Sequence, residues 1–85
     1  MEYLVVSFRS RSHTMKFYEF LTANGVYAQI VNTPKEAGVG CGLSVQTKKE
    51  NLYAVRRAVK MLNLSSFAGI FLINNGYGKR FITSI

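Results

Sequence analysis

Cys41 is the residue whose type and setting could most directly do chemistry. It is the only cysteine of the chain and lies between Gly40 and Gly42 in the stretch NTPKEAGVGCGLSVQ, residues 32–46. Because glycines carry no side chain, backbone amides and a partner molecule can approach the sulfur closely. A thiol becomes a nucleophile or a carrier when nearby cations, backbone N–H groups or a helix N-terminus favour its thiolate form. Two interpretations follow: a working thiol, or a small residue in a tight loop without a chemical role.

The loop before Cys41 supplies groups that could act on the thiol. Pro34 stiffens the start of this loop, and Lys35 brings a positive charge that would stabilise an anionic sulfur. Glu36 opposes thiolate formation by its own charge, or it could accept a proton. No helix is predicted to begin at Cys41, so we expect no help from a helix N-terminus. The predicted reactive residue is therefore Cys41, and its predicted binding neighbours are Pro34, Lys35, Glu36, Gly40 and Gly42.

Other chemistries find little support in the sequence. His13 is the only histidine, and one cysteine with one distant histidine does not make a metal site. A Cys–His dyad would form only if the fold brought the two together. The run Gly-Val-Gly-Cys-Gly lacks the Gly-Lys-Ser/Thr ending of a phosphate-binding loop and precedes a predicted strand. We expect no metal and no cofactor, and a carrier or binding protein rather than a self-sufficient enzyme.

The length and the charge of the chain limit the classes of protein to which it could belong. The 85 residues make a single domain, 1–85. No apolar run reaches the roughly 18 residues of a membrane span, and the acidic start of the chain is unlike a signal peptide. A single cysteine forms no internal disulfide, so a cytoplasmic location is expected. The formal net charge of +7 favours contact with anions: nucleic acid, a phosphate-bearing ligand or an acidic partner protein.

The chain reads in order as strand, helix, strand, strand, helix, strand. Residues 3–8, 26–31, 43–47 and 69–73 are rich in β-branched, aromatic or alternating apolar residues and predict strands. A first helix is predicted over 12–24, ended by Gly25. A second runs from Lys49 to Asn63, and its apolar residues follow helical spacing: Leu52, Val55, Ala58, Val59 and Leu62. Two βαβ halves predict an α+β, ferredoxin-like βαββαβ sandwich, a four-stranded antiparallel sheet with both helices on one face.

Residues 74–85 lie beyond this predicted core of residues 1–73. Asn75-Gly76 is a strong signal for a two-residue hairpin turn. Residues 77–85 could then return as an extra edge strand, for which Phe81, Ile82 and Ile85 supply apolar side chains. The alternative is a frayed chain end.

Basic residues collect on the polar side of the second predicted helix. They form a candidate surface for an anion or a partner, with Tyr53 among them: Lys49, Arg56, Arg57 and Lys60. Such a surface could bind nucleic acid through phosphate contacts and stacking. Aromatic residues on an exposed sheet face could assist, namely Tyr3, Phe8, Tyr27 and Phe71. The alternatives are an ordinary solvated helix face, or a regulatory or assembly module that pairs as a homodimer through the 74–85 segment.

The motif TPKEAGVGCGLSV, in its strand and helix setting, resembles the putative selenium/sulfur carrier protein-like family of small bacterial domains. The shared features are Thr33-Pro34 followed by a basic residue and Glu36, then Cys41-Gly42-Leu43, with Ser12-His13 at the first helix start and Gly25 at its end. The resemblance covers residues 1–73. It implies that Cys41 accepts sulfur or selenium from a donor protein as a persulfide or perselenide and passes it to an acceptor, without a cofactor.

The chain departs from the family pattern in two places. The family loop before Cys-Gly tends to be rich in serine, whereas here it reads Ala-Gly-Val-Gly over residues 37–40. This removes hydroxyls that could hydrogen-bond a persulfide. The segment 74–85 is extra, and it could cover a sheet edge or build a dimer.

Overall fold

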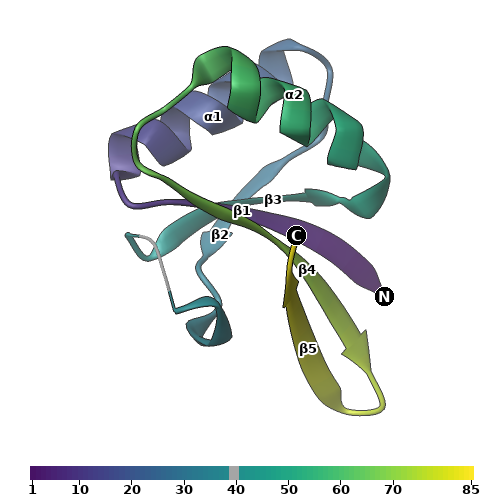
Figure 1. Ribbon diagram of the computed structural model, residues 1–85. Coiled ribbons are helices and arrows are strands. Elements are labelled where there is room, and N and C mark those ends of the chain that lie inside the picture. Colours follow the sequence, from purple (N-terminus) through teal and green to yellow (C-terminus); the bar gives the residue numbers. More distant parts are fainter. Residues whose placement is uncertain (39–40) are drawn as a thin grey trace.

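The computed structural model describes residues 1–38 and 41–85, and within them five strands form one antiparallel sheet with two α-helices on one face (Figure 1). The strands are β1 (Glu2–Phe8), β2 (Gln29–Asn32), β3 (Leu43–Lys48), β4 (Phe67–Gly76) and β5 (Lys79–Ser84). The helices are α1 (Arg11–Ala23) and α2 (Leu52–Leu62), with short 3-10 turns η1 (Lys35–Ala37) and η2 (Lys49–Asn51). In this described part, no helix is long and apolar enough to cross a membrane.

The strand order β2-β3-β1-β4-β5 confirms the predicted ferredoxin-like α+β arrangement and adds β5 at one edge. The predicted strand 26–31 begins later than expected, at Gln29. The reason lies at the end of α1, where Gly25 adopts a left-handed φ of 78°. Val26 N–H then donates to the Leu21 carbonyl at 2.9 Å. This hydrogen bond ends the helix in the manner of a Schellman motif, so Val26 belongs to the cap and not to β2.

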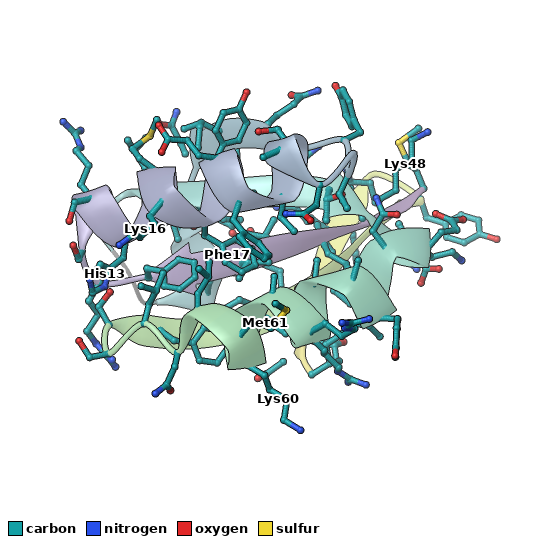
Figure 2. All side chains as sticks on the ribbon, turned by 90° about the horizontal axis from the view of Figure 1, so that it is seen from above. His13, Lys16, Phe17, Lys48, Lys60 and Met61 are labelled. Carbon is teal, nitrogen blue, oxygen red and sulfur yellow. The ribbon has the colours of Figure 1, made fainter. Side chains whose placement is uncertain are left out.

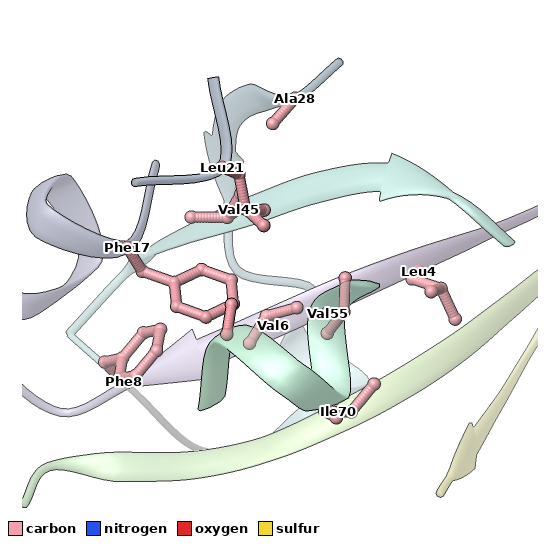
Figure 3. Close-up of a cluster of buried hydrophobic side chains, with 10 residues drawn as sticks. Leu4, Val6, Phe8, Phe17, Leu21, Ala28, Val45, Val55 and Ile70 are labelled. Atoms are coloured by element: carbon pink, nitrogen blue, oxygen red, sulfur yellow. The ribbon is translucent and has the colours of Figure 1, made fainter. Parts of the chain in front are cut away.

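The core lies between the sheet and the helices (Figure 3). Alternate residues of β1 point toward the helices, and Phe8 meets Phe17 of α1 with ring centroids 5.1 Å apart. Phe17 is fully buried. Figure 2 looks onto the helices and shows Phe17 between α1 and α2. This packing fixes where α1 begins relative to the end of β1.

A second, smaller cluster covers part of the opposite sheet face. Val5, Phe71 and Ile73 are buried there, and Ala37 of η1 and Ile82 of β5 pack against them. The nucleic-acid interpretation placed Phe8 and Phe71 on an exposed sheet face. Phe8 belongs instead to the helix-side core, and Phe71 is only 8% exposed.

Residues 74–85 form the predicted hairpin, but with a different turn. Asn75 and Gly76 still pair within β4, where Gly76 is opposite Lys79. The turn residues are Tyr77 and Gly78, with φ of 52° and 73°. Positive φ at both central positions is what a type I′ hairpin turn requires. The expectation of a turn at Asn75-Gly76 was therefore wrong by two residues.

Candidate thiol site

Cys41 lies at the end of the sheet where β1 stops and α1 starts. Its backbone N–H donates to the Phe8 carbonyl at 3.1 Å. The next residue, Gly42, accepts a hydrogen bond from Thr33 N–H at 2.9 Å. The cysteine backbone is thus held to two segments distant in sequence, and its side chain is half-buried.

The sulfur is adjacent to a hydroxyl and a carbonyl. Thr14 Oγ1 lies 3.7 Å from Cys41 Sγ, and the thiol can donate to the Leu43 carbonyl at 3.5 Å. The Thr14 hydroxyl has other acceptors, the Ser10 carbonyl at 3.2 Å and the Leu43 carbonyl at 3.4 Å. Because a hydroxyl rotates to suit its surroundings, Thr14 can turn its proton toward the sulfur once the thiol is ionised.

These surroundings favour the thiolate. Burial raises the pKa of the Cys41 thiol, but hydrogen bonding to the sulfur from the backbone at Leu43, the Thr14 hydroxyl and the backbone of Cys41 itself, with a smaller contribution from the Arg11 charge, outweighs it. The pKa is therefore lowered from its ordinary value. A cation and a hydroxyl at a half-exposed sulfur are the setting in which thiols become reactive.

The expectation that no helix N-terminus would act on Cys41 was wrong, because α1 begins beside it. Helix α1 begins at Arg11, and Ser10 caps it by accepting a hydrogen bond from His13 N–H. The first turn of α1 contains Thr14, which contacts the sulfur, and Arg11, whose charge lowers the pKa of the thiol. A helix start therefore does lie beside Cys41 and favours a negative charge there. Sequence reasoning missed it because Thr14 and Cys41 are 27 residues apart.

A Thr14→Val variant is expected to raise the pKa of Cys41. Valine keeps the shape of the buried Thr14 side chain but removes the hydroxyl that stabilises the thiolate. The rate of alkylation by iodoacetamide, followed against pH, should show its midpoint at higher pH than in the wild-type protein. Thr22→Val is the matched control, because Thr22 bonds to the Tyr18 carbonyl near the other end of α1. Identical midpoints for Thr14→Val and wild type would contradict the assignment.

The residues predicted to assist Cys41 lie in more than one part of the structure. Pro34 precedes η1, which contains Lys35 and Glu36. This turn lies on the side of the sheet away from the helices (Figure 1). Gly42 has a left-handed φ of 97°, and a side chain there would meet nothing within 4 Å among the residues that the structure describes. Gly40 lies outside the described residues.

Glu36 forms an ion pair with a residue of the last strand, β5. Arg80 Nη2 of β5 lies 2.9 Å from Glu36 Oε1, and its Nε lies 3.3 Å from the other carboxylate oxygen. Hydrogen bonding with the backbone of Glu36 itself and with Arg80 holds the pKa of this carboxyl below its ordinary value of 4.5. The extra strand is thereby connected to the turn that precedes Cys41.

An Arg80→Ser variant is expected to raise the pKa of Glu36 toward its ordinary value. A lowered carboxyl pKa adds stability that is present above the unfolded value of about 4.5 and is lost as pH falls through the folded value. Because the pair is exposed, the effect on stability should be small. The carboxyl carbon chemical shift of Glu36, titrated by NMR, measures the change. Lys79→Ser, in the same strand, should leave it unaltered, and an unshifted Glu36 in Arg80→Ser would contradict the ion pair.

His13 has Ser66 as its side-chain partner. Its Nδ1 lies 2.6 Å from Ser66 Oγ, in the turn that leads into β4. Within residues 1–38 and 41–85, no group of His, Cys, Asp and Glu gathers that could hold a metal ion.

The predicted basic surface divides in two. Lys49 forms an ion pair with Glu2 at 2.8 Å. The other three residues lie with Tyr53 along one groove beside α2: Arg56, Arg57 and Lys60. The structure therefore brings together three of the four predicted cations.

Comparison with known proteins gives one match. A family model described as "Putative Se/S carrier protein-like" matches residues 3–66, about three quarters of the chain. The matched region contains Arg11, Thr14 and Cys41, and it ends before β4 begins. No curated protein and no solved structure matches the chain.

Proposed function

Because the chain belongs to the "Putative Se/S carrier protein-like" family, we propose that it carries sulfur or selenium on Cys41 as a transient persulfide or perselenide. The family name points to a carrier in general.

The observation that carries this proposal is the setting of the thiol. Cys41 is half-buried, its thiolate is favoured by Thr14 and Arg11, and within the described residues a side chain at Gly42 would meet no atom within 4 Å. A structural cysteine gains nothing from a lowered pKa, whereas a thiol that must attack another sulfur reacts as its thiolate. Partial exposure lets the active site of a second protein reach the sulfur.

Loading and release are two exchanges of the same kind. The Cys41 thiolate attacks the terminal sulfur of a donor persulfide, forms a new S–S bond and breaks the old one, and the donor thiolate leaves. The product is Cys41–S–SH, or Cys41–S–SeH when the donor holds selenium. An acceptor thiolate then attacks the outer atom and releases the Cys41 thiolate. No net oxidation occurs, so the protein needs no redox partner.

The outer S–H group of a persulfide is acidic, so the outer sulfur readily carries a negative charge. Nearby groups must stabilise that charge. The Thr14 hydroxyl already lies beside the sulfur and the charge of Arg11 acts on it, and in this proposal both groups stabilise the transferred atom. Lys35 adds positive charge in the same loop, Pro34 stiffens its start, and Glu36 tethers it to Arg80. Partners are then a donor protein and an acceptor protein, in the reducing cytoplasm where a free thiol persists.

The test is intact mass after incubation with a cysteine desulfurase and free cysteine. The wild-type protein is expected to gain the mass of one sulfur. Dithiothreitol should remove it, because the reductant cleaves the S–S bond and releases hydrogen sulfide. A protein that stays at its original mass beside a persulfide-loaded desulfurase would overturn the proposal.

A further inference from the structure

A groove of about 650 Å³ runs between α2 and the β4–β5 edge of the sheet. Its floor is apolar and includes Val59, Phe67, Ile70 and Ile85. Gly69 also lines it. The groove shares no residue with the surroundings of Cys41.

One side of the groove is positively charged. Arg56, Arg57 and Lys60 of α2 line it, and all three are exposed. Figure 2 shows Lys60 on the side of α2 that faces away from α1. Within the described residues the ion pairs are Lys49–Glu2 and Arg80–Glu36, so no Asp or Glu side chain pairs with these three cations. None of the four acidic residues of the chain lines the groove.

We propose that this groove binds an acidic segment of a partner protein that inserts an apolar side chain. The apolar floor fits an aliphatic or aromatic anchor, and the cations of α2 fit carboxylates that flank it. Binding sites of this kind combine a buried anchor with complementary charge at the rim. The inference does not depend on the chemistry of Cys41.

The lining favours a protein segment over nucleic acid. Single strands bind by stacking bases on exposed aromatic faces. The most exposed aromatic residue of the groove, Tyr53, has the Arg57 guanidinium over its ring at 5.9 Å from the centroid. Phe67 packs edge-on against Phe8 in the core. The remaining floor is aliphatic, which suits a leucine or isoleucine side chain better than a base.

Selection from a phage-displayed library of random peptides supplies the probe. Peptides enriched on the wild-type protein are expected to combine Asp or Glu with Leu, Ile or Phe. The leading peptide, labelled with fluorescein, is then titrated by fluorescence anisotropy. An Arg56→Ser/Lys60→Ser variant should bind it roughly three- to tenfold more weakly, and Ile85→Asp should also weaken it by placing a carboxylate on the floor. These residues are exposed, so both variants should keep the wild-type circular dichroism spectrum.

The controls separate this site from general charge and from the thiol. Lys16→Ser removes a cation from α1, which does not line the groove, and should bind like wild type. Cys41→Ser should also bind like wild type, even if the carrier proposal fails. Four results would overturn the inference: no enrichment, enriched peptides without acidic residues, equal weakening in Lys16→Ser, or a single-stranded RNA oligonucleotide that displaces the peptide and is lost in Arg56→Ser/Lys60→Ser.

Discussion

A Cys41→Ser protein is expected to gain no sulfur under conditions in which the wild-type protein gains one. The substitution changes a single atom, and the serine hydroxyl can still donate to the Leu43 carbonyl that the thiol reaches at 3.5 Å. It cannot form the S–S bond on which the carrier role depends, and the chain has no other cysteine. Intact mass spectrometry after incubation with a cysteine desulfurase and cysteine measures the difference, which should be complete.

Two comparisons make this result specific. The thermal unfolding midpoint of Cys41→Ser should match that of wild type, which excludes loss of the fold as the cause. Thr14→Val should reach the wild-type mass more slowly, since its thiol is ionised to a smaller extent at neutral pH. Sulfur on Cys41→Ser would show that the gain occurs elsewhere and would remove Cys41 from the proposal.

Replacing Phe17 by alanine is expected to lower the free energy of unfolding by about 3–5 kcal/mol. Phe17 is 0% exposed and packs on Phe8 between the sheet and the helices. Its removal leaves a cavity that rigid strands cannot fill. A domain of this size is stable by only roughly 4–13 kcal/mol, so the variant should be close to unfolding. Urea denaturation followed by circular dichroism measures the change.

Met61→Ala is the matched control for the loss of a large apolar side chain. Met61 lies on α2 but is 64% exposed, so its effect should stay within about 0.5 kcal/mol. A loss for Phe17→Ala no larger than that for Met61→Ala would contradict the core described here. Partial unfolding of α1 in Phe17→Ala should also return the Cys41 alkylation profile toward that of an ordinary thiol, because Arg11 and Thr14 belong to that helix.

The local pattern of the sequence predicted most of the fold. Leu52, Val55, Ala58 and Val59 recur at helical spacing because one side of α2 must face a sheet, and that period is visible without coordinates. The β-branched run at residues 3–8 likewise predicted the central strand, now β1. With two βαβ halves, few chain paths remain for such a short domain. Cys41, framed by glycines, could also be selected from the sequence, although its role there is still a prediction.

The hairpin turn required the tertiary structure. A turn at Asn75-Gly76 would place Gly78 opposite Ile73, so the returning strand would offer no side chain to pack against that buried residue. The observed turn places Ile82 opposite Ile73, so both join the cluster on the face away from the helices. The local preference of Asn-Gly for a turn favours one register of the hairpin, and the packing of Ile82 on Ile73 favours another. The observed register is the one that makes this packing possible.

The surroundings of the thiol also required the tertiary structure. By itself, the sequence determined the succession of strands and helices, the single thiol between glycines and the excess of basic residues. It could not place Thr14 beside Cys41, bring the charge of Arg11 to act on the thiol, or pair Arg80 with Glu36. Those contacts join segments far apart in the chain, and their positions are set by the packing of α1 on the sheet and by the pairing of β5. Local propensity acts within a few residues, whereas the thiolate is stabilised by groups that only the folded core brings together.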